Sequence, residues 1–332
     1  MGKIRVAING FGRIGRVFTR AIQGNDNIEL VAINDLSDTV TLAHLLKYDS
    51  IHRGFNGTVV ARDNEIVIND IEVKVFNERD PENLPWAALN VDLVVEATGL
   101  FRTRALASKH IKAGAKKVIL SAPAKEDGIR TVVIGINDDL IDGTEQIISN
   151  ASCTTNCAAP MVKIIDELCG IQNGYITTIH SYTGDQRLHD APHSDLRRAR
   201  AAAESIVPTT TGAAKAITKI FPHLHGHMGG GGIRVPVPDG SLTDITCMVN
   251  NPVSAEELNS VFKEYAEGSL KGILEYIDEP IVSTDIIGNT HSVVYDSELT
   301  SVIGNMIKVV GWYDNEAGYS NRIVDLIERV QA

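Results

Sequence analysis

A glycine-rich turn near the N-terminus limits the fold of this chain more than any other feature. The run "KIRVAING" (Lys3–Gly10) has the apolar character of a buried strand, and "FGRIGRVFTRAIQ" after it has the pattern of an amphipathic helix. The run "IELVAIND" (Ile28–Asp35) predicts a second strand. The turn itself, Gly10–Gly15, matches G-x-G-x-x-G, and the acid Asp35 follows it by about 20 residues. This context predicts a dinucleotide-binding βαβ unit, and the alternative is a glycine-rich turn that holds no ligand.

Each glycine of this motif is required for a different structural reason. Gly10 permits the tight turn, Gly12 lets the backbone approach a pyrophosphate, and Gly15 lets the helix pack on the strand. The helix then begins with N–H groups that face the phosphates. The carboxylate of Asp35 can accept hydrogen bonds from ribose hydroxyls.

Further strands and helices alternate through the first half of the chain. "VDLVVEATG" (Val91–Gly99) and "KKVILSAPA" (Lys117–Ala124) are typical of buried parallel strands, with "RALASKHIKAGA" as a helix between them. "TVVIGIN" and "QIISNAS" are expected to continue the pattern. Residues 59–76 alternate between apolar and polar and predict an antiparallel insertion. The first domain is therefore expected to end near residue 150.

Length and charge exclude several classes of protein. The chain has 332 residues, which indicates two domains, and a net charge of −11 without a basic stripe, which argues against a nucleic-acid partner. No signal peptide and no apolar run long enough for a membrane span is visible, so a membrane partner is not expected. Four cysteines in so long a chain do not form a disulfide framework. We expect a reduced, cytoplasmic protein.

The stretch "NASCTTNCAAP" (Asn150–Pro160) places a thiol where a helix is expected to begin. The thiol of Cys153 could bind a metal, form a disulfide, pack in a core or act as a nucleophile. The first turn of a helix stabilises a thiolate and offers N–H groups to an oxyanion, which favours the nucleophile. The C-x-x-x-C spacing and the lack of a second cysteine pair disfavour zinc. We interpret Cys157, Cys169 and Cys247 as small buried residues.

A nucleophilic cysteine usually requires a base, and the chain offers ten histidines. In "GYITTIHSYTGDQ", His180 stands at the end of a β-branched strand that enters a glycine-containing loop. Catalytic residues often occupy such positions, so His180 is the candidate base, although spacing alone does not select it.

At this point the motifs resemble a known family. "INGFGRIGR", "SNASCTTNC", "TTIHSYTGDQ", "RRARAAAESIVPTTTGAAKA", "IRVPVP" and "GWYDNEAGYSNR" are similar to phosphorylating glyceraldehyde-3-phosphate dehydrogenase, in order and over nearly the whole chain. The resemblance implies an α/β fold with a Rossmann-type NAD-binding domain over 1–150 and an α+β catalytic domain with a mixed or antiparallel sheet over 151–315. It also implies that a C-terminal helix at about 316–332 packs back on the first domain.

The resemblance further implies the chemistry. Cys153 would attack the aldehyde of glyceraldehyde 3-phosphate to form a thiohemiacetal, with His180 as the base, and hydride would leave for NAD. Inorganic phosphate would then attack the resulting thioester to give an acyl phosphate. A thiolate is both a good nucleophile and a good leaving group, so one side chain serves both steps.

The remaining site residues are carried over from the family by matching motifs, and no metal is expected. The substrate phosphate would lie at Thr183 and Arg234, and Asn315 would bind the nicotinamide carboxamide. A homotetramer is also implied, because the residues from Ser181 to about Glu204 resemble a loop that lines the neighbouring subunit's cofactor site. The attacking phosphate would be held by Ser152, Thr154, Arg198, Thr211 and Gly212, and the cofactor by Gly10, Phe11, Gly12, Arg13, Ile14, Gly15, Asp35, Arg79 and Ser121.

Two departures from the family affect these expectations. "HLHGHMGGGGIR" has glycines where relatives usually carry bulkier residues, so we expect a flexible segment that holds Arg234 loosely. Its three histidines are interpreted as a solvated loop rather than a metal site. Ala191 replaces a leucine common in NAD-restricted relatives, while Pro192 is retained. Because Asp35 repels a 2′-phosphate, we expect NAD to be preferred, with some use of NADP.

Two other functions compete with this interpretation. Erythrose-4-phosphate dehydrogenase shares the nucleophile and base, although "SYTGDQ" and "TTTGAAK" look more like the glyceraldehyde-phosphate enzyme. A non-catalytic nucleotide-binding or interaction protein is the second alternative, and the combination of Cys153, His180 and two anion pockets argues against it.

Overall fold

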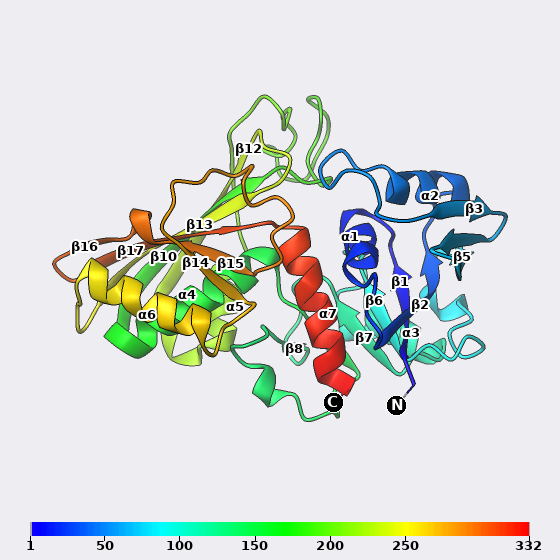
Figure 1. Ribbon diagram of the computed structural model, residues 1–332, viewed down its shortest axis with the longest axis horizontal. Helices are drawn as coiled ribbons and strands as arrows, with labels where there is room; N and C mark the ends of the chain where they lie inside the picture. The colour runs from blue at the N-terminus through cyan, green and yellow to red at the C-terminus, as the bar shows by residue number, and fades with distance from the viewer. Residues whose placement is uncertain (1, 332) are drawn as a thin grey trace. The chain divides into compact units, whose positions relative to one another are not determined.

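The computed structural model describes residues 2–331, which divide into two compact units. Unit 1 contains the chain up to Val132, residues 138–151 and the C-terminal part from Ser320. Unit 2 contains residues 133–137 and 152–319. Each unit is built on one sheet (Figure 1).

Unit 1 has a nine-stranded sheet in the order β3-β4-β5-β2-β1-β6-β7-β9-β8. The strands from β5 to β8 are parallel, and β3, β4 and β5 pair antiparallel. The strands are β1 (Ile4–Asn9), β2 (Ile28–Asn34), β3 (Val59–Arg62), β4 (Glu65–Ile68), β5 (Ile71–Phe76), β6 (Leu93–Glu96), β7 (Lys117–Leu120), β8 (Arg130–Thr131) and β9 (Ile147–Ser149). The helices are α1 (Arg13–Ala21), α2 (Thr39–Lys47) and α3 (Arg104–Lys112), with residues 320–331 of α7 (Ala317–Gln331).

The glycine motif allows α1 to lie directly on β1. Gly10 has φ of +96°, and a Cβ on Gly15 would lie 2.5 Å from the carbonyl oxygen of Gly10 and 3.2 Å from Ile8 Cγ2. Ala7, which points to the opposite face, belongs to a buried apolar cluster with Ala107 of α3. The two helices therefore cover opposite faces of the sheet, as in a doubly wound fold.

Most predicted elements of this half are confirmed, including the antiparallel insertion at residues 59–76. The expectation for "TVVIGIN" is wrong, because β8 covers only Arg130–Thr131. The backbone N–H of Val133 donates to the side-chain oxygen of Asn137 at 2.8 Å. This N–H is therefore not used in a β-ladder. An asparagine side chain here replaces the neighbouring strand as hydrogen-bond partner.

Unit 2 has a mixed sheet in the order β11-β12-β10-β13-β17-β15-β14, and β16 pairs with β17. The strands are β10 (Ile171–Ser181), β11 (Val207–Thr209), β12 (Met228–Val235), β13 (Ser241–Val249), β14 (Leu274–Ile277), β15 (Val293–Asp296), β16 (Ser301–Ile303) and β17 (Met306–Tyr313). The helices are α4 (Cys153–Cys169), α5 (Ala213–Ile220) and α6 (Ala255–Glu267), which pack on one face of the sheet (Figure 1).

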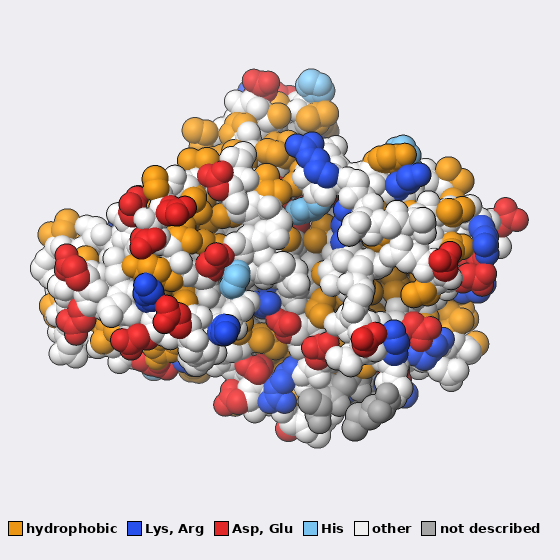
Figure 2. Space-filling view, in the orientation of Figure 1, with side chains coloured by type: hydrophobic (Ala, Val, Ile, Leu, Met, Phe, Trp, Pro, Cys, Tyr) orange, Lys and Arg blue, Asp and Glu red, His pale blue; other side chains and the backbone are white. Residues whose placement is uncertain are grey.

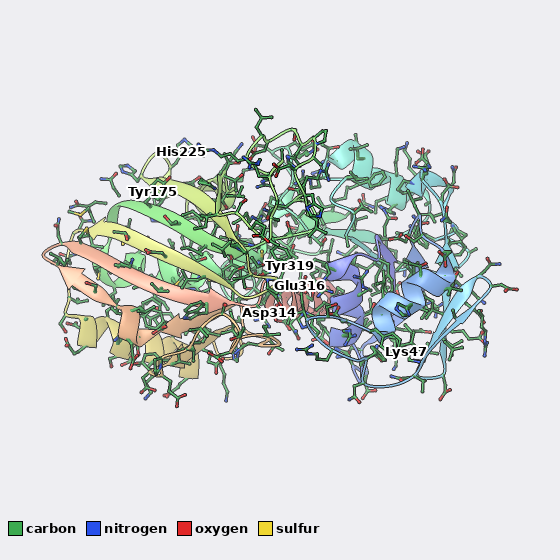
Figure 3. All side chains as sticks on the ribbon, turned by 90° about the horizontal axis from the view of Figure 1, so that it is seen from above. Lys47, Tyr175, His225, Asp314, Glu316 and Tyr319 are labelled. Atoms are coloured by element: carbon green, nitrogen blue, oxygen red, sulfur yellow. The ribbon has the colours of Figure 1, made fainter. Side chains whose placement is uncertain are left out.

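The four glycines before Arg234 form the middle of strand β12, so the expectation of a flexible segment is wrong. Gly229–Gly232 pair in parallel with β10, and Gly232 also pairs with Thr209 of β11. The Tyr175 ring lies over this stretch, since a Cβ on Gly229 would be 2.7 Å from its Cδ2 (Figure 3). Pairing with β10 along the whole stretch, together with the covering ring, orders the backbone that glycine side chains cannot hold.

In residues 2–331, no helix is both long enough and apolar enough to cross a bilayer.

On the face drawn in Figure 2, lysine and arginine side chains are scattered among aspartate and glutamate side chains.

Candidate active site

The candidate nucleophile is the first residue of α4, as predicted. Ser152 caps the helix, and its Oγ accepts from the backbone N–H of Thr155 at 3.1 Å. The preceding residue, Ala151, has φ of +56°, a left-handed conformation that is strained for alanine and that the sequence did not indicate. This turn places Cys153 at the positive end of a 17-residue helix.

The candidate base lies at the end of β10 and faces the thiol. His180 Nε2 is 3.4 Å from Cys153 Sγ, and the ring is 4% exposed. Its Nδ1 lies 2.8 Å from the carbonyl oxygen of Ser181, so we assign the ring hydrogen to Nδ1. This tautomer leaves Nε2 as an acceptor for the thiol proton. The Tyr313 ring meets the imidazole edge-on and fixes its plane.

Both groups of the pair have shifted pKa values. Burial raises the pKa of the Cys153 thiol, and the charge of Arg234 and a backbone hydrogen bond from Thr154 oppose the rise. Burial, and then the charge of Arg234, lower the pKa of His180 to about 3. Burial therefore opposes charge on both groups, and for the thiol it acts against the helix terminus, which favours a thiolate.

The residues predicted to hold the substrate phosphate lie together beside this pair. Arg234 Nη1 is 3.0 Å from His180 Nδ1, donates to the carbonyl oxygen of Ser181 at 3.0 Å, and is 3.4 Å from Thr183 Oγ1. In the strand register Arg234 is the direct partner of His180. Arg234 is thus firmly held, despite the glycines before it.

The residues predicted for the second anion pocket are not all joined by direct contacts. Arg198 donates to Asp185 Oδ2 at 2.6 Å and to Thr209 Oγ1 at 3.0 Å. Thr211 and Gly212 precede α5, and Gly212 caps it without a side-chain hydrogen bond. Nothing in the sequence pattern indicated the acidic partner of Arg198.

Thr154 is also predicted to hold the attacking phosphate, and its side chain is turned into the core. Its hydroxyl lies 2.9 Å from the Tyr313 hydroxyl, which in turn lies 2.8 Å from Thr178 Oγ1. The other cysteines, Cys157, Cys169 and Cys247, are buried, in agreement with their interpretation as core residues.

The carboxyl edge of the unit 1 sheet has the features that a dinucleotide requires. No atom lies within 4 Å of a Cβ built on Gly12, and α1 begins there without a capping side chain. A helix N-terminus without a capping side chain is a position that suits an anion. The Arg13 guanidinium is paired with Asp49 at 2.5 Å, so its contribution would be its backbone N–H.

Asp35 is fixed at the end of β2 next to this turn. Its Oδ2 accepts from the backbone N–H of Phe11 at 2.8 Å, and its Oδ1 accepts from Ser37 at 3.0 Å. Arg79 and Ser121 follow β5 and β7 at the same edge. Ile14 is the second residue of α1. These residues fit a dinucleotide on unit 1.

Asn315 belongs to unit 2 and is held by two serines that the sequence did not single out. Its Oδ1 accepts from Ser181 Oγ at 2.8 Å and from Ser241 Oγ at 2.7 Å. These contacts fix the amide so that its N–H₂ group is the end available to a ligand.

Comparison with known proteins decides the family. Residues 4–104 match the glyceraldehyde 3-phosphate dehydrogenase NAD binding domain, and residues 152–315 match the C-terminal domain of the same enzyme. The chain belongs to the glyceraldehyde 3-phosphate dehydrogenase family. It is 56% identical over 334 residues to the glyceraldehyde-3-phosphate dehydrogenase of Mycobacterium avium, with 98% of each chain covered. It is 55% identical to that of Geobacillus stearothermophilus, with 97% of each covered, and 52% identical to that of Priestia megaterium, with 99% and 98% covered.

Membership of the glyceraldehyde 3-phosphate dehydrogenase family confirms the resemblance noted in the motifs. It also confirms the fold class, a Rossmann-type NAD-binding domain with a separate catalytic domain, and NAD as the cofactor. The erythrose-4-phosphate and non-catalytic alternatives are not favoured, because the named relatives match over nearly the full chain.

Proposed function

We propose that this protein oxidises D-glyceraldehyde 3-phosphate with NAD and inorganic phosphate to 1,3-bisphosphoglycerate, as a glycolytic dehydrogenase. The observation that carries the proposal is the pair of Cys153 Sγ and His180 Nε2, 3.4 Å apart at a helix N-terminus in a chain of this family. A thiol next to a neutral imidazole at such a position is suited to attack on a carbonyl carbon.

The chain's own residues carry the proton and the acyl group. Cys153 Sγ attacks the aldehyde carbon while its proton moves to His180 Nε2. His180 then gives that proton to the former carbonyl oxygen, which becomes the hydroxyl of a thiohemiacetal. His180 takes the hydroxyl proton as hydride leaves carbon, which yields a thioester. A phosphate oxygen then attacks the thioester carbonyl, and the carbon–sulfur bond breaks to release the acyl phosphate. Bound NAD supplies the hydride acceptor.

Two anion positions serve these steps in the proposal. Thr183 and Arg234 hold the substrate phosphate, which the 3.4 Å contact between them supports. Ser152, Arg198 and the open N-terminus of α5 at Gly212 hold the attacking phosphate. Hydroxyls, N–H groups and guanidinium suit tetrahedral oxyanions. Thr154 and Thr211 complete this set, Thr154 through its backbone N–H.

On unit 1, the turn from Gly10 to Gly15 holds the pyrophosphate, and Asp35 holds the adenosine ribose. Its carboxylate disfavours a 2′-phosphate, so NAD is preferred, while Ala191 leaves room for some use of NADP. Arg79 and Ser121 complete the cofactor contacts on this unit, and Asn315 binds the nicotinamide carboxamide.

The domain limits, the assembly and the location are part of the same proposal. The NAD-binding domain covers residues 1–150, joined by the C-terminal helix, and the catalytic domain covers 151–315. The protein is a cytoplasmic homotetramer without nucleic-acid or membrane partners, by its resemblance to the family.

The test is an assay of NAD reduction with glyceraldehyde 3-phosphate at varied phosphate, with erythrose 4-phosphate as the comparison sugar. Turnover should require phosphate and should stop when one cysteine per chain is carboxymethylated by iodoacetate. Faster turnover of erythrose 4-phosphate would favour the other sugar, and phosphate-independent turnover would contradict the acyl-transfer step.

A further inference from the structure

A row of buried polar side chains crosses the unit 1 sheet at the carboxyl ends of three neighbouring strands. Asn34 ends β2, Asn9 ends β1 and Glu96 ends β6, and they are 4%, 2% and 2% exposed. Asn9 is the direct register partner of both others. Asn34 Nδ2 donates to Asn9 Oδ1 at 2.7 Å, and Asn9 Nδ2 donates to Glu96 Oε2 at 2.6 Å. We call these three residues the polar ladder.

The ladder ends at a carboxylate whose contacts are all donors. Besides Asn9, Glu96 accepts from the backbone N–H of Thr98 at 2.9 Å and from the Thr98 hydroxyl. Trp86 Nε1 donates to His110 Nδ1 at 3.1 Å, so His110 carries its hydrogen on Nε2, which lies 3.1 Å from Glu96 Oε2. Four donors therefore meet one buried carboxylate, an arrangement that fits only its charged form.

The ladder lies where the strand order reverses. The chain passes from β1 to β2 on one side and later to β6 on the other, so β1 and β6 flank the crevice where ligands of such sheets bind. Asn9 and Asn34 immediately precede Gly10 and Asp35. The Asn34 side chain also pairs with both backbone groups of Glu78, at 2.8 and 2.9 Å, one residue before the proposed cofactor contact Arg79.

The glycine turn itself touches the segment that Glu96 fixes. A Cβ on Gly10 would lie 2.8 Å from the backbone nitrogen of Thr98, so the turns after β1 and β6 are in contact. Glu96 binds Thr98 directly and Gly10 through the side chain of Asn9. We propose that Glu96 is a positioning residue for NAD, which through the polar ladder keeps the cofactor-contacting segments in register. This inference rests on the proposed assignment of the cofactor contacts.

The test is to replace the charge without changing the shape. In E96Q the new amide N–H₂ must face two of the four former donors, so one side of the ladder loses its acceptor. The dissociation constant of NAD, measured by titration calorimetry on cofactor-stripped protein, should rise by at least about tenfold. The rate of Cys153 alkylation by iodoacetamide should stay the same, because the thiol pair is left intact.

A charge exchange distinguishes positioning from a general packing role. In the double variant N9D/E96Q, the carboxylate introduced at position 9 accepts from Asn34 and from the amide introduced at position 96. One of its oxygens takes the place of Asn9 Nδ2, which lies 3.4 Å from His110 Nε2. Donors and acceptors then match again, so NAD affinity should return to within about threefold of wild type. If E96Q does not fold, Thr98→Val removes a single donor and should raise the dissociation constant by about threefold.

The matched control is Asp92→Asn, at the amino ends of the same two strands. Asp92 Oδ2 accepts from the backbone N–H of Arg5 at 2.9 Å, so the variant should lose stability but bind NAD normally. The inference is overturned if E96Q binds NAD as tightly as wild type, if D92N weakens binding equally, or if the double variant fails to restore it. A wild-type chain that does not bind NAD would instead refute the proposed function.

Discussion

The Arg198 guanidinium is ion-paired with Asp185, and together with the proposed phosphate site this predicts that Asp185→Asn tightens the binding of inorganic phosphate. Arg198 Nη1 lies 2.6 Å from Asp185 Oδ2, and the two side chains are 20% and 53% exposed. Burial raises the pKa of Asp185, but the hydrogen bond and charge of Arg198 outweigh it, and the net shift is downward. The carboxylate is therefore charged at neutral pH, and at the proposed site phosphate would have to compete with it for Arg198.

The size of the effect follows from the distance and the exposure. Two unit charges 2.6 Å apart attract by ~1.6 kcal/mol in water. Because Asp185 is half exposed, solvent screening and side-chain entropy reduce this, and exposed pairs are usually worth about 0.2–1 kcal/mol. A gain of about 0.5–1 kcal/mol corresponds to a two- to fivefold lower KM for phosphate. Arg198 keeps its position in the variant through Thr209 Oγ1.

The assay is steady-state NAD reduction at saturating glyceraldehyde 3-phosphate with varied phosphate. Asp190→Asn is the matched control, because Asp190 pairs with Arg200 at 2.9 Å in the same loop, and its KM for phosphate should not change. The amplitude of the pre-steady-state burst should also be unchanged in D185N, since phosphate enters after hydride transfer. A KM for phosphate that stays constant in D185N would refute competition. A KM that rises would also refute it and would show that Asp185 orients Arg198 for the anion.

Three further outcomes are expected. Cys153→Ser should abolish turnover and retain NAD binding, because a hydroxyl is too weak an acid for this role, whereas Cys157→Ser should keep most activity; the assay and calorimetry check both. Asp35→Ala should narrow the preference for NAD over NADP, measured as the ratio of kcat/KM values, and an unchanged ratio would assign the choice to the loop at 191–192. Gly230→Ala should lower stability to urea by about 1–3 kcal/mol, because the new Cβ would lie 2.9 Å from Ala214 Cβ. Gly232→Ala, with contacts no closer than 3.6 Å, should be nearly neutral.

The elements that the sequence predicted well are those set by local chemistry. The turn at Gly10–Gly15, the helix that starts at Cys153, and the strand that ends near His180 depend on backbone conformation and periodicity over a few residues. The choice of the base was weaker, because the place of His180 at a strand end favoured it among ten histidines but spacing did not select it, and the family resemblance supplied the pairing with Cys153. Spatial proximity of distant residues is set by sheet order, which periodicity does not contain.

The failed expectations share a cause, which is the tertiary partner. Gly229–Gly232 suggested flexibility because glycine has few intrinsic constraints, but the ladder with β10, a second ladder that begins at Gly232 and the Tyr175 ring order the segment. "TVVIGIN" suggested a strand because it is β-branched, but the ladder to β9 ends after Val132, and the Asn137 side chain accepts from the N–H of Val133 instead. None of these partners is adjacent in sequence.

The position of Arg234 explains how a histidine with so low a pKa can still serve as the base. Arg234 lies against Nδ1 of His180 at 3.0 Å, whereas the Cys153 thiol lies against Nε2, on the other edge of the ring. Its positive charge therefore opposes the imidazolium, while burial opposes the thiolate. If Thr183 and Arg234 hold the substrate phosphate, as proposed, that phosphate would offset the charge of Arg234 and would raise the pKa of the adjacent His180. Transfer of the thiol proton to His180 would then become easier once the phosphorylated aldehyde is bound.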